Sequence, residues 1–505
     1  MPKDRVASYY NPQPKIKTDA NGKRTYRVRG TYGGDRGDYA GDTQAFTASM
    51  AAVKVLLNSV ISDEADWLTA DIKDFYLGTP VERYEYMRIT RAQIPQCIID
   101  EFELEDIFEN DVVMMELHKG IYGLKQAGIL AQKQLFKHLE EHGYTQCPNT
   151  PAVFCHKDRP TKFAVVVDDF GIKVGGAQKD RAENTQHLLD TLRKKYIITV
   201  DTYGKQYLGI NINVNHKAHT VTMDMRGYMP KILRREGIAH EREIHTPANY
   251  QQPRRGPEDL LVAKDDISPL ISAERALTYM RLIGGFQYYV CSIESAWRPI
   301  ISKLAQHAAK PTEKNWEELM WLCQHAYTHP NGSIVYRASD MQLKGHTDGS
   351  HQSEKNSRSR AAAYFYFGSA DVNDTTDLNG AILVDSAVIS VVTASAAETE
   401  YAATFMGAIN AEALRTIATD LGHPQGPTPL ITDNKTVDGI VNNTCKQRRS
   451  KAMDMRFNWV RDRVGQGHFL VMWRRGKDNY ADFFSKIHPN SYYREQKLKY
   501  TPESE

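Results

Sequence analysis

The stretch KFAVVVDDFGIKV, residues 162–174, constrains the fold more than any other part of this chain. It places two adjacent aspartates in the middle of an apolar run that is otherwise typical of a buried β-strand. A buried carboxylate is costly unless it is paired or bound to a cation, and two adjacent carboxylates also repel each other. A tight turn at Asp168-Asp169 explains the pattern, since aspartate is common in turns. A cation site on that turn explains it equally well, and other residues must distinguish the two.

Composition excludes several other classes of protein. The chain has 505 residues, enough for roughly three domains, and its net charge of +2 implies that any nucleic-acid groove must be local. We expect no signal peptide and no membrane span, because the N-terminus is polar and no apolar stretch is long enough. The six cysteines are far apart in sequence and form no C-x-x-C pair, which predicts neither a zinc finger nor a disulfide framework and fits a reducing compartment. They are Cys97, Cys147, Cys155, Cys291, Cys323 and Cys445.

The pattern of strands and helices changes twice along the chain. Up to residue 225, strands and helices are mixed, which predicts an α+β sheet covered on one face by helices, with one helix beginning at Thr43 as N-cap. Residues 226–335 are mostly helical in pattern, with a linker marked by Pro247, Pro253 and Pro257. Residues 336–490 begin with short strands, one of them at 388–395, and continue as a compact α/β unit that includes a basic helix at 446–463.

Asp71 ends an apolar strand in LTADIKDFY. Taken alone it is best explained as a strand-end cap. Together with Asp168 and Asp169 on a neighbouring strand, it could bind two divalent cations about 3.5–4 Å apart, which would activate a hydroxyl and orient a triphosphate. Oxygen ligands without nearby histidine or cysteine indicate Mg²⁺ rather than zinc.

A second set of acids lies in the last third of the chain. Each member lies near the end of an apolar strand or in the first turns of a helix, where a capping or solvated role is the more common explanation. If the α/β unit brings them together, they could bind a second metal pair for hydrolysis of a phosphodiester by activated water. They are Asp348, Glu400, Asp433 and Asp482.

The order of motifs resembles a known family. DIKDFYLGTP…YEYMR, LHKGIYGLKQA and VVVDDFGIK resemble the reverse transcriptase of copia-type LTR retrotransposons (Pseudoviridae). YLGININ, ALTYMRLIGGFQYY and HTDGS…AETEY…ITDNKTV…NYADFFSK resemble that family's thumb, connection and ribonuclease H. The similarity is collinear over residues 24–488, and three polymerase motifs followed by four hydrolase motifs in this order are highly specific.

The resemblance implies a fold and its domains. It implies an α+β polymerase right hand (fingers, palm and thumb), followed by a connection and an α/β ribonuclease H-like domain. The fingers and palm would span 1–225, the mostly helical thumb and connection 226–335, the ribonuclease H-like domain 336–490 and a C-terminal tail 491–505.

It also implies roles for individual residues. The catalytic metal ligands would be Asp71, Asp168 and Asp169 in the polymerase, and Asp348, Glu400, Asp433 and Asp482 in the nuclease, with two Mg²⁺ per site and Mn²⁺ as the alternative ion. Glu398 also fits the family's E-x-E pattern, but Glu400 fits better.

Four further residues match nucleotide-binding positions of the family. Tyr76 matches the aromatic gate that crowds a ribose 2′-OH, and core packing is its other explanation. Gln126 matches a glutamine near the incoming nucleotide. Arg29, and less closely Arg27, match a finger-strand position that contacts triphosphate, although a solvated strand face explains both equally well. The basic helix at 446–463 would either follow hybrid phosphates or form a solvated face.

The chain departs from the family at several points. Val166 stands where the polymerase turn usually has tyrosine, which puts the primer-end contact in doubt, and Ala452 stands where the nuclease usually has histidine. We see no protease or integrase motif upstream. We therefore expect a mature polyprotein fragment, a degraded element or a host-retained copy.

The function implied by the resemblance is that of an RNA- and DNA-directed DNA polymerase with ribonuclease H (endonuclease) activity. It would copy the RNA of a transposable element into cDNA for DNA integration. Its partners would be an RNA template, a DNA primer, the RNA–DNA hybrid, dNTPs and other polyprotein products, in cytoplasmic particles or in the nucleus. The alternatives are a catalytically silent, host-retained nucleic-acid-binding scaffold, and an RNA-templated RNA polymerase, which Tyr76 and the nuclease motifs disfavour.

Overall fold

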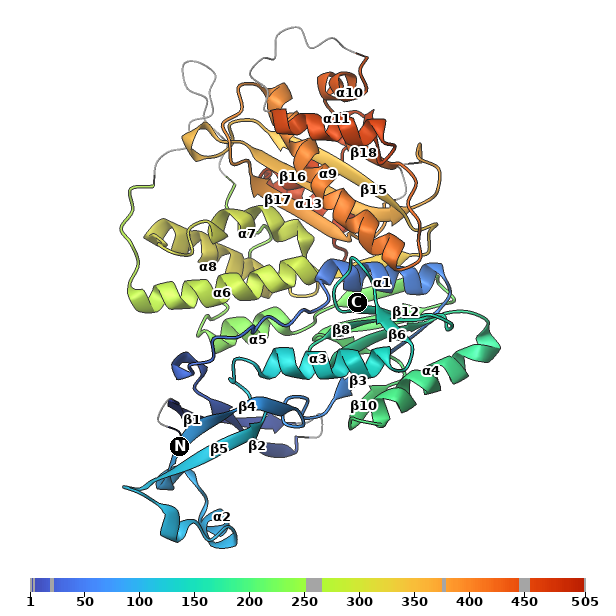
Figure 1. Cartoon of the computed structure of the whole chain (residues 1–505). Coiled ribbons are helices and arrows are strands. Elements are labelled where there is room, and N and C mark those ends of the chain that lie inside the picture. The colour runs from blue at the N-terminus through green and yellow to red at the C-terminus, as the bar shows by residue number, and fades with distance from the viewer. Residues whose placement is uncertain are drawn as a thin grey trace.

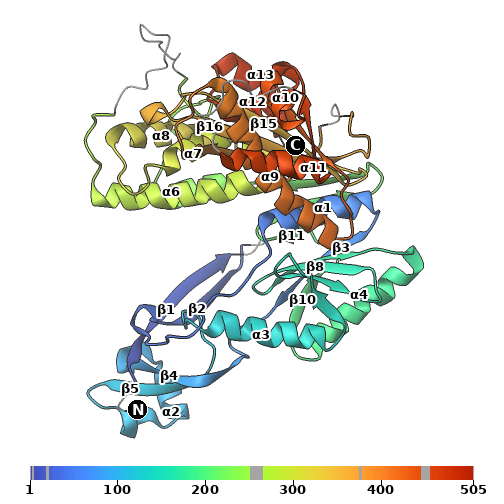
Figure 2. The same ribbon diagram turned by 45° about the horizontal axis from the view of Figure 1, so that its top comes forward.

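A computed structural model gives the structure of residues 2, 5–18, 22–250, 266–374, 378–444 and 455–503. The chain begins in a β-rich lobe at one end, continues into a six-stranded sheet, and finishes in an α/β unit at the other end (Figure 1). Helix α1 lies between the six-stranded sheet and this C-terminal unit in both views (Figures 1 and 2). None of the helices in the described ranges is both long and apolar enough to cross a bilayer.

The N-terminal lobe is a four-stranded sheet in the order β2-β1-β4-β5. Its strands are β1 (Ala7–Thr18), β2 (Arg24–Tyr32), β4 (Pro80–Thr90) and β5 (Val112–Lys119). β1 pairs antiparallel with β2 and parallel with β4. Strand β1 was not predicted, because its sequence ASYYNPQPKIKT is polar and contains two prolines, which are unfavourable inside a strand.

The six-stranded sheet has the order β10-β3-β9-β8-β7-β6, all antiparallel. Its strands are β3 (Asp66–Ile72), β6 (Tyr144–Gln146), β7 (Val153–His156), β8 (Thr161–Val166), β9 (Asp169–Val174) and β10 (Ile198–Asp201). Helices α3 (Ala127–Glu140) and α4 (Gln178–Arg193) share a buried cluster with Leu68 and Ile72 on one face. Helix α1 (Met50–Ser62) shares another with Trp67 and Ala164.

The prediction of helices on one face of this sheet is therefore wrong, since α1 covers the other face. Strands β8 and β9 are buried on both faces, which explains their continuous apolar character. The predicted N-cap at Thr43 is also wrong. The N-cap of α1 is Ser49, six residues later, whose side chain accepts a hydrogen bond from the backbone N–H of Ala52.

A small third sheet, in the order β11-β12-β13-β14, joins the helical segment to the strands before it. It contains β11 (Gln206–Tyr207), β12 (Ile210–Asn215), β13 (Thr220–Asp224) and β14 (Ser333–Arg337). Between β13 and β14 lie α5 (Tyr228–Arg235), α6 (Ala273–Ser292), α7 (Arg298–Ala305) and α8 (Glu313–Thr328), as the helical pattern predicts. Pro253 and Pro257 of the expected linker lie outside the described residues.

The C-terminal unit is a five-stranded sheet in the order β17-β16-β15-β18-β19. Strands β15, β16 and β17 are antiparallel, whereas β18 is parallel to both β15 and β19. The strands are β15 (Gln342–Ser350), β16 (Arg360–Gly368), β17 (Leu383–Val388), β18 (Thr428–Thr432) and β19 (Phe469–Trp473). The helices are α9 (Ala396–Asp420), α10 (Lys435–Val441), α11 (Asn458–Gly465), α12 (Asp482–Ser485) and α13 (Asn490–Tyr500).

One predicted strand in this unit is wrong, and the structure adds detail to two other predictions. No strand covers 389–395, because the strand ends at Val388 and the chain turns toward α9. The basic helix predicted from Lys446 lies outside the described residues up to position 454, and the described part consists of a short 3₁₀ turn and α11. The expected C-terminal tail is the helix α13, with Tyr493, Lys497 and Tyr500 buried.

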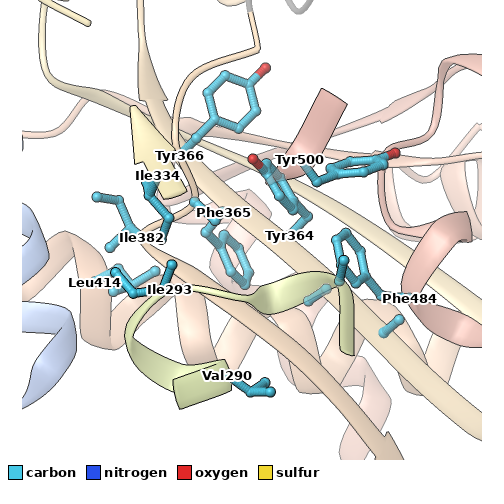
Figure 3. Packing of buried hydrophobic residues seen from close by; sticks show 14 of the residues in the cluster. Val290, Ile293, Ile334, Tyr364, Phe365, Tyr366, Ile382, Leu414, Phe484 and Tyr500 are labelled. Carbon is cyan, nitrogen blue, oxygen red and sulfur yellow. The ribbon is translucent and has the colours of Figure 1, made fainter. Parts of the chain in front are cut away.

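One buried core joins the helical segment to the C-terminal unit. Figure 3 shows Val290 and Ile293 from the end of α6 and Ile334 from β14 beside Phe365 of β16. Tyr364 of β16 packs with Phe484 and Tyr500 at ring-centroid distances of 5.6 Å each. The C-terminal unit therefore does not bury its sheet alone, but shares its hydrophobic core with the segment before it.

The remaining elements are short. They are α2 (Gln96–Glu101) and the 3₁₀ helices Gly34–Arg36, Arg91–Gln93, Leu104–Ile107, Ser295–Trp297, Lys355–Ser357, Met455–Phe457 and Gly476–Asp478.

Candidate active sites

The first acidic cluster consists of Asp71, Asp168 and Asp169 on two paired strands. Asp71 near the end of β3 is the direct cross-strand partner of Asp169, the first residue of β9. Asp168 lies in the tight turn between β8 and β9, and its carbonyl accepts a hydrogen bond of 3.0 Å from the Ile72 N–H. The two explanations of the aspartate pair are therefore compatible, because the tight turn places the carboxylates of Asp168 and Asp169 beside Asp71.

Val167, the residue before Asp168, has an unusual backbone conformation. Its φ is 63°, in the left-handed region that a β-branched residue rarely occupies. Such strain persists where surrounding structure fixes it, and it is frequent at functional sites. Here the β8–β9 pairing on one side and the Ile72 hydrogen bond on the other hold the turn that presents the two aspartates.

Electrostatics in this cluster disfavour the charged state. Burial, together with repulsion from Asp168 and Asp71, raises the pKa of Asp169 to about 6. Burial also raises the pKa of Asp168, and Asp71 adds to that effect while Arg29 opposes it. A cation between these carboxylates would remove the repulsion that produces both shifts.

Tyr76 and Arg29 both lie close enough to Asp168 to interact with its charge. Burial raises the pKa of the half-buried Tyr76, and the carboxylate of Asp168 raises it further. The Tyr76 ring meets the Tyr122 ring edge-on at 5.5 Å, and the Arg29 guanidinium lies 5.0 Å from the centre of the same Tyr122 ring. The structure thus brings Tyr76 and Arg29 close to the first acidic cluster.

The other two predicted nucleotide contacts have partners of their own. Arg27 forms an ion pair with Asp74 at 3.4 Å. The buried Gln126 donates a hydrogen bond from its amide N to Glu85 Oε1 at 2.9 Å, and its own Oε1 has no hydrogen-bond partner. The Gln126 amide is therefore engaged with strand β4 of the N-terminal lobe.

A hollow of about 240 Å³ adjoins the first acidic cluster. Besides Asp71 and Asp169 it is lined by Thr199 of β10, the cross-strand partner of Asp71, and by Asp201. The Asp201 carboxylate accepts hydrogen bonds from the N–H groups of Tyr203 and Lys205 at 3.0 and 2.8 Å, so it caps a turn. The sequence does not reveal these residues, because nothing in ITVDTYGK resembles a site until β10 is placed beside β3.

The second acidic cluster consists of Asp348, Glu400 and Asp433. One carboxylate oxygen from each lies within 4.8 Å of the others. Asp348 is on β15, and Asp433 follows the neighbouring parallel strand β18, whose C-terminal end meets the same edge of the sheet. Within the described ranges, no other three histidine, cysteine or acidic side chains approach this closely, and the first acidic cluster is more open.

The fourth predicted acid, Asp482, stands beside this cluster rather than within it. Its Oδ1 lies 2.5 Å from Nζ of Lys486, one turn further along. Repulsion from Asp482 nevertheless contributes to the raised pKa values of Asp348 and Asp433, so Asp482 is close enough to join them. Glu398, the alternative to Glu400, accepts a hydrogen bond of 2.6 Å from the Ala394 N–H and has a local capping role.

The second acidic cluster is strongly perturbed. Burial and repulsion from Asp348 and Asp433 raise the pKa of Glu400 to about 9. Burial raises the pKa of Asp348 to about 6. Glu400 Oε2 is buried and has no hydrogen-bond partner. A buried carboxylate with an oxygen that has no hydrogen-bond partner, close to two other carboxylates, fits a hard divalent cation such as Mg²⁺.

Comparison with known proteins supports the resemblance seen in the sequence. Residues 13–250 match the family model described as reverse transcriptase (RNA-dependent DNA polymerase). The chain therefore contains a reverse transcriptase domain, and it is similar to the pol products of copia-type retrotransposons.

Two curated proteins give that similarity in detail. A retrovirus-related Pol polyprotein from transposon TNT 1-94 of Nicotiana tabacum is 20% identical over 449 residues, which are 88% of this chain and 31% of the tobacco protein. The putative transposon Ty5-1 protein of Saccharomyces cerevisiae is 26% identical over 254 residues, which are 48% of this chain and 74% of the yeast protein. The chain thus spans about a third of the tobacco polyprotein.

Solved structures of ribonucleases H also match. The N-terminal RNase H domain of a Mycobacterium tuberculosis protein is 14% identical, with 32% of this chain and 97% of that one covered and a TM-score of 0.21. RNase H1 from Halobacterium salinarum is 17% identical, with 28% and 94% covered and a TM-score of 0.20.

Proposed function

We propose that this chain is a DNA polymerase directed by RNA and DNA, and that its C-terminal unit is a ribonuclease H that cuts the RNA strand of the hybrid. The observation that carries the proposal is the presence of two separate acidic clusters. One lies on the β8–β9 turn of the reverse transcriptase domain, and the other lies in the α/β unit that follows. Both contain carboxylates whose pKa values are raised by burial and mutual repulsion.

In the polymerase site, Asp71, Asp168 and Asp169 would hold Mg²⁺ or Mn²⁺. Such ions, when bound in pairs, lower the pKa of an attacking hydroxyl and neutralise charge on the leaving group. Arg29 lies close enough to Asp168 to influence its pKa and would contact the triphosphate of a dNTP. Tyr76 stands on the same side and would leave no room for a ribose 2′-OH, which selects deoxynucleotides.

In the nuclease site, Asp348, Glu400 and Asp433 would hold the cations. Asp482 would become the fourth ligand once its ion pair with Lys486 is broken. Glu400 is buried, has an oxygen without a hydrogen-bond partner and lies close to the other two acids, so the site is preorganised for a positive charge rather than for a neutral ligand. Gly476 permits the close approach of the following loop, since a Cβ there would lie 3.0 Å from Asp433 Oδ2.

Primer extension tests the polymerase assignment. The full chain is given a DNA primer on an RNA template with dNTPs and Mg²⁺, beside Asp168→Asn and the control Asp66→Asn. Asp66 is an exposed residue at the start of β3 that pairs with Arg181. We expect extension by the wild type and by the control, and a loss of at least about a hundredfold in Asp168→Asn. Equal extension by all three proteins would refute the assignment.

Cleavage of a labelled RNA–DNA hybrid tests the nuclease assignment separately. Asp433→Asn should abolish cleavage and leave primer extension intact, whereas Asp168→Asn should do the reverse. The control is Asp438→Asn on α10, whose carboxylate accepts a hydrogen bond from Asn442. Tight hybrid binding without extension or cleavage in the wild type would instead favour the silent scaffold.

A further inference from the structure

The six-stranded sheet and helix α9 meet at a polar joint, formed by the C-terminal end of α9 and the β6–β8 region. The Asp420 carboxylate at the end of α9 accepts hydrogen bonds from the Asn149 N–H at 3.1 Å and from Thr150 Oγ1 at 2.7 Å. The ammonium group of Lys162 on β8 donates to the carbonyl of Leu421. This joint connects the reverse transcriptase domain directly to the helix that carries Glu400.

Two cysteines lie in this joint. Cys147 follows β6 and Cys155 is in β7, and their Sγ atoms are 3.2 Å apart. Each Sγ also lies 3.7 Å from the carbonyl oxygen of Asp420. Both are free thiols, and the β6–β7 hairpin brings them together although they are eight positions apart in sequence.

The two thiols differ in exposure and in acidity. Cys147 is 4% exposed, whereas Cys155 is partly accessible to solvent. The hydrogen bond from Cys147 is the main cause that lowers the pKa of Cys155, with Lys162 contributing. The same contact and burial raise the pKa of Cys147. Cys155 is therefore the thiol able to attack a small disulfide in solution, and Cys147 is placed to resolve the product.

We propose that Cys147 and Cys155 form a redox-active pair that closes reversibly to a disulfide within the joint between the six-stranded sheet and α9. With oxidised glutathione, or another low-molecular-weight disulfide, the Cys155 thiolate attacks one sulfur and releases one small thiol. The Cys147 thiolate then attacks Cys155 Sγ and releases the second. The two protein thiols are oxidised, the small disulfide is reduced to two thiols, and the two protons pass to those thiols.

Closure of this bond changes the joint. Both thiols lose their S–H groups, including the one that Cys155 directs at the Asp420 carbonyl, and the sulfurs must approach from 3.2 Å to bonding distance, about 2.05 Å. The last turn of α9 then loses a weak hydrogen bond to the Asp420 carbonyl. We expect the oxidised chain to be looser at Asp420–His423 than the reduced chain.

The test is to incubate the full reduced chain with oxidised glutathione and to map its thiols by differential alkylation and intact mass. We expect the wild type to lose two of its six free thiols and the mass of two hydrogens. Cys147 should be linked to Cys155, and neither should retain glutathione. Cys147→Ser should keep a stable glutathione adduct on Cys155. Dithiothreitol should reverse both changes.

The exposed Cys97, which lies in α2 far from the joint in sequence, provides the control. Cys97→Ser should leave closure of the pair unchanged. Hydrogen exchange of the amides of residues 420–423 should quicken on oxidation of the wild type and stay constant in the Cys147→Ser/Cys155→Ser double variant. A wild type that holds glutathione on Cys155 while Cys147 stays free, or one that reacts only at Cys97, would overturn the proposal. None of these readouts depends on polymerase or nuclease activity.

Discussion

Asp71 of β3 lies directly across from Asp169 of β9, so two carboxylates occupy one cross-strand pair of the six-stranded sheet. Like charges in such a pair destabilise a sheet. Here the cost is increased by burial and by Asp168, and the pKa of Asp169 rises to about 6 as a result. The cation-free fold therefore carries an electrostatic strain at the residues that would bind the ion.

Replacing Asp169 by asparagine should stabilise the cation-free protein. A folded pKa of about 6, above the ordinary aspartate value of 3.8, means that the fold prefers the protonated acid. The contribution of the Asp169 carboxyl to the free energy of unfolding is therefore fully present below about pH 4 and is lost as the pH rises through about 6. In EDTA at neutral pH, Asp169→Asn should gain about 1–2 kcal/mol in free energy of unfolding. The gain should vanish in acid, as measured by urea denaturation.

The effect of Mg²⁺ on thermal stability should differ between the wild type and Asp169→Asn. The ion should raise the melting temperature of the wild type and have a much smaller effect on Asp169→Asn, because the variant has lost a ligand. Asp66→Asn, at the exposed start of β3, should respond to Mg²⁺ like the wild type. If Asp169→Asn were less stable than the wild type in EDTA at neutral pH, this would contradict the repulsion among the three carboxylates.

Tyr76 should control the choice between deoxynucleotides and ribonucleotides. Its ring is held by Tyr122 and Phe75, at 5.5 and 5.6 Å, beside Asp168. Tyr76→Val should remove the bulk that excludes a 2′-OH and should raise the use of rNTPs relative to dNTPs by about tenfold or more, as measured by the ratio of kcat/KM values. Tyr76→Phe keeps the ring and should retain the preference. Unchanged discrimination in Tyr76→Val would assign this ring to core packing alone.

Much of both acidic clusters could be predicted from sequence, because the chemistry is local. An aspartate pair inside an apolar run is visible in one strand, and each nuclease acid follows or begins a recognisable element. Their convergence depends on strand order, which no local pattern contains. That Asp433 approaches Asp348 follows from the parallel pairing of β15 with β18. That Asp482 is held by Lys486 depends on side-chain geometry within one helical turn.

Other features escaped prediction for physical reasons. The start of α1 at Ser49 was missed because the preceding residues are also compatible with a helix, and only the hydrogen bond from Ala52 identifies the cap. The hollow beside Asp71 needs β10, which is distant in sequence. The contact between Cys147 and Cys155 needs a hairpin whose short strands have no strong periodic pattern. In each case the missing information is tertiary.

Lys486 should limit how tightly the nuclease site binds cations. Burial lowers its pKa, but the hydrogen bond and charge of Asp482, together with the charge of Asp348, outweigh burial and raise it. Its ammonium group thus neutralises carboxylates that a metal would otherwise bind. Lys486→Met should tighten Mn²⁺ binding at this site about tenfold, as measured by electron paramagnetic resonance titration of the free ion.

Lys477→Met, in the exposed 3₁₀ turn before α12, removes a lysine of the same charge and serves as the control. It should leave Mn²⁺ affinity nearly unchanged. Weaker Mn²⁺ binding in Lys486→Met would mean that the lysine organises the ligands rather than competing with the ion.

Asp63 should stabilise the packing of α1 against the six-stranded sheet. The buried ammonium group of Lys173 donates to Asp63 Oδ2 at 2.5 Å and to Ser59 Oγ at 2.8 Å, and burial lowers its pKa to about 8. Asp63→Asn leaves that charge less well compensated. We expect a loss of about 1–2 kcal/mol in free energy of unfolding near neutral pH, reduced from the value for a fully buried pair because Asp63 is partly exposed.

The pH dependence distinguishes loss of charge compensation from a simple packing defect. The folded pKa of Lys173 is about 8, below the ordinary lysine value of 10.5. The fold therefore disfavours the charged amine and gains stability as pH rises from about 8 to 10.5. Without Asp63 the folded pKa falls further. The deficit of Asp63→Asn should therefore be largest below pH 8 and shrink above it, as measured by urea denaturation across that range. Asp66→Asn, which breaks a more exposed pair with Arg181, should cost less than about 0.5 kcal/mol at every pH. A deficit of Asp63→Asn that is constant with pH would show that Lys173 is not the group responsible.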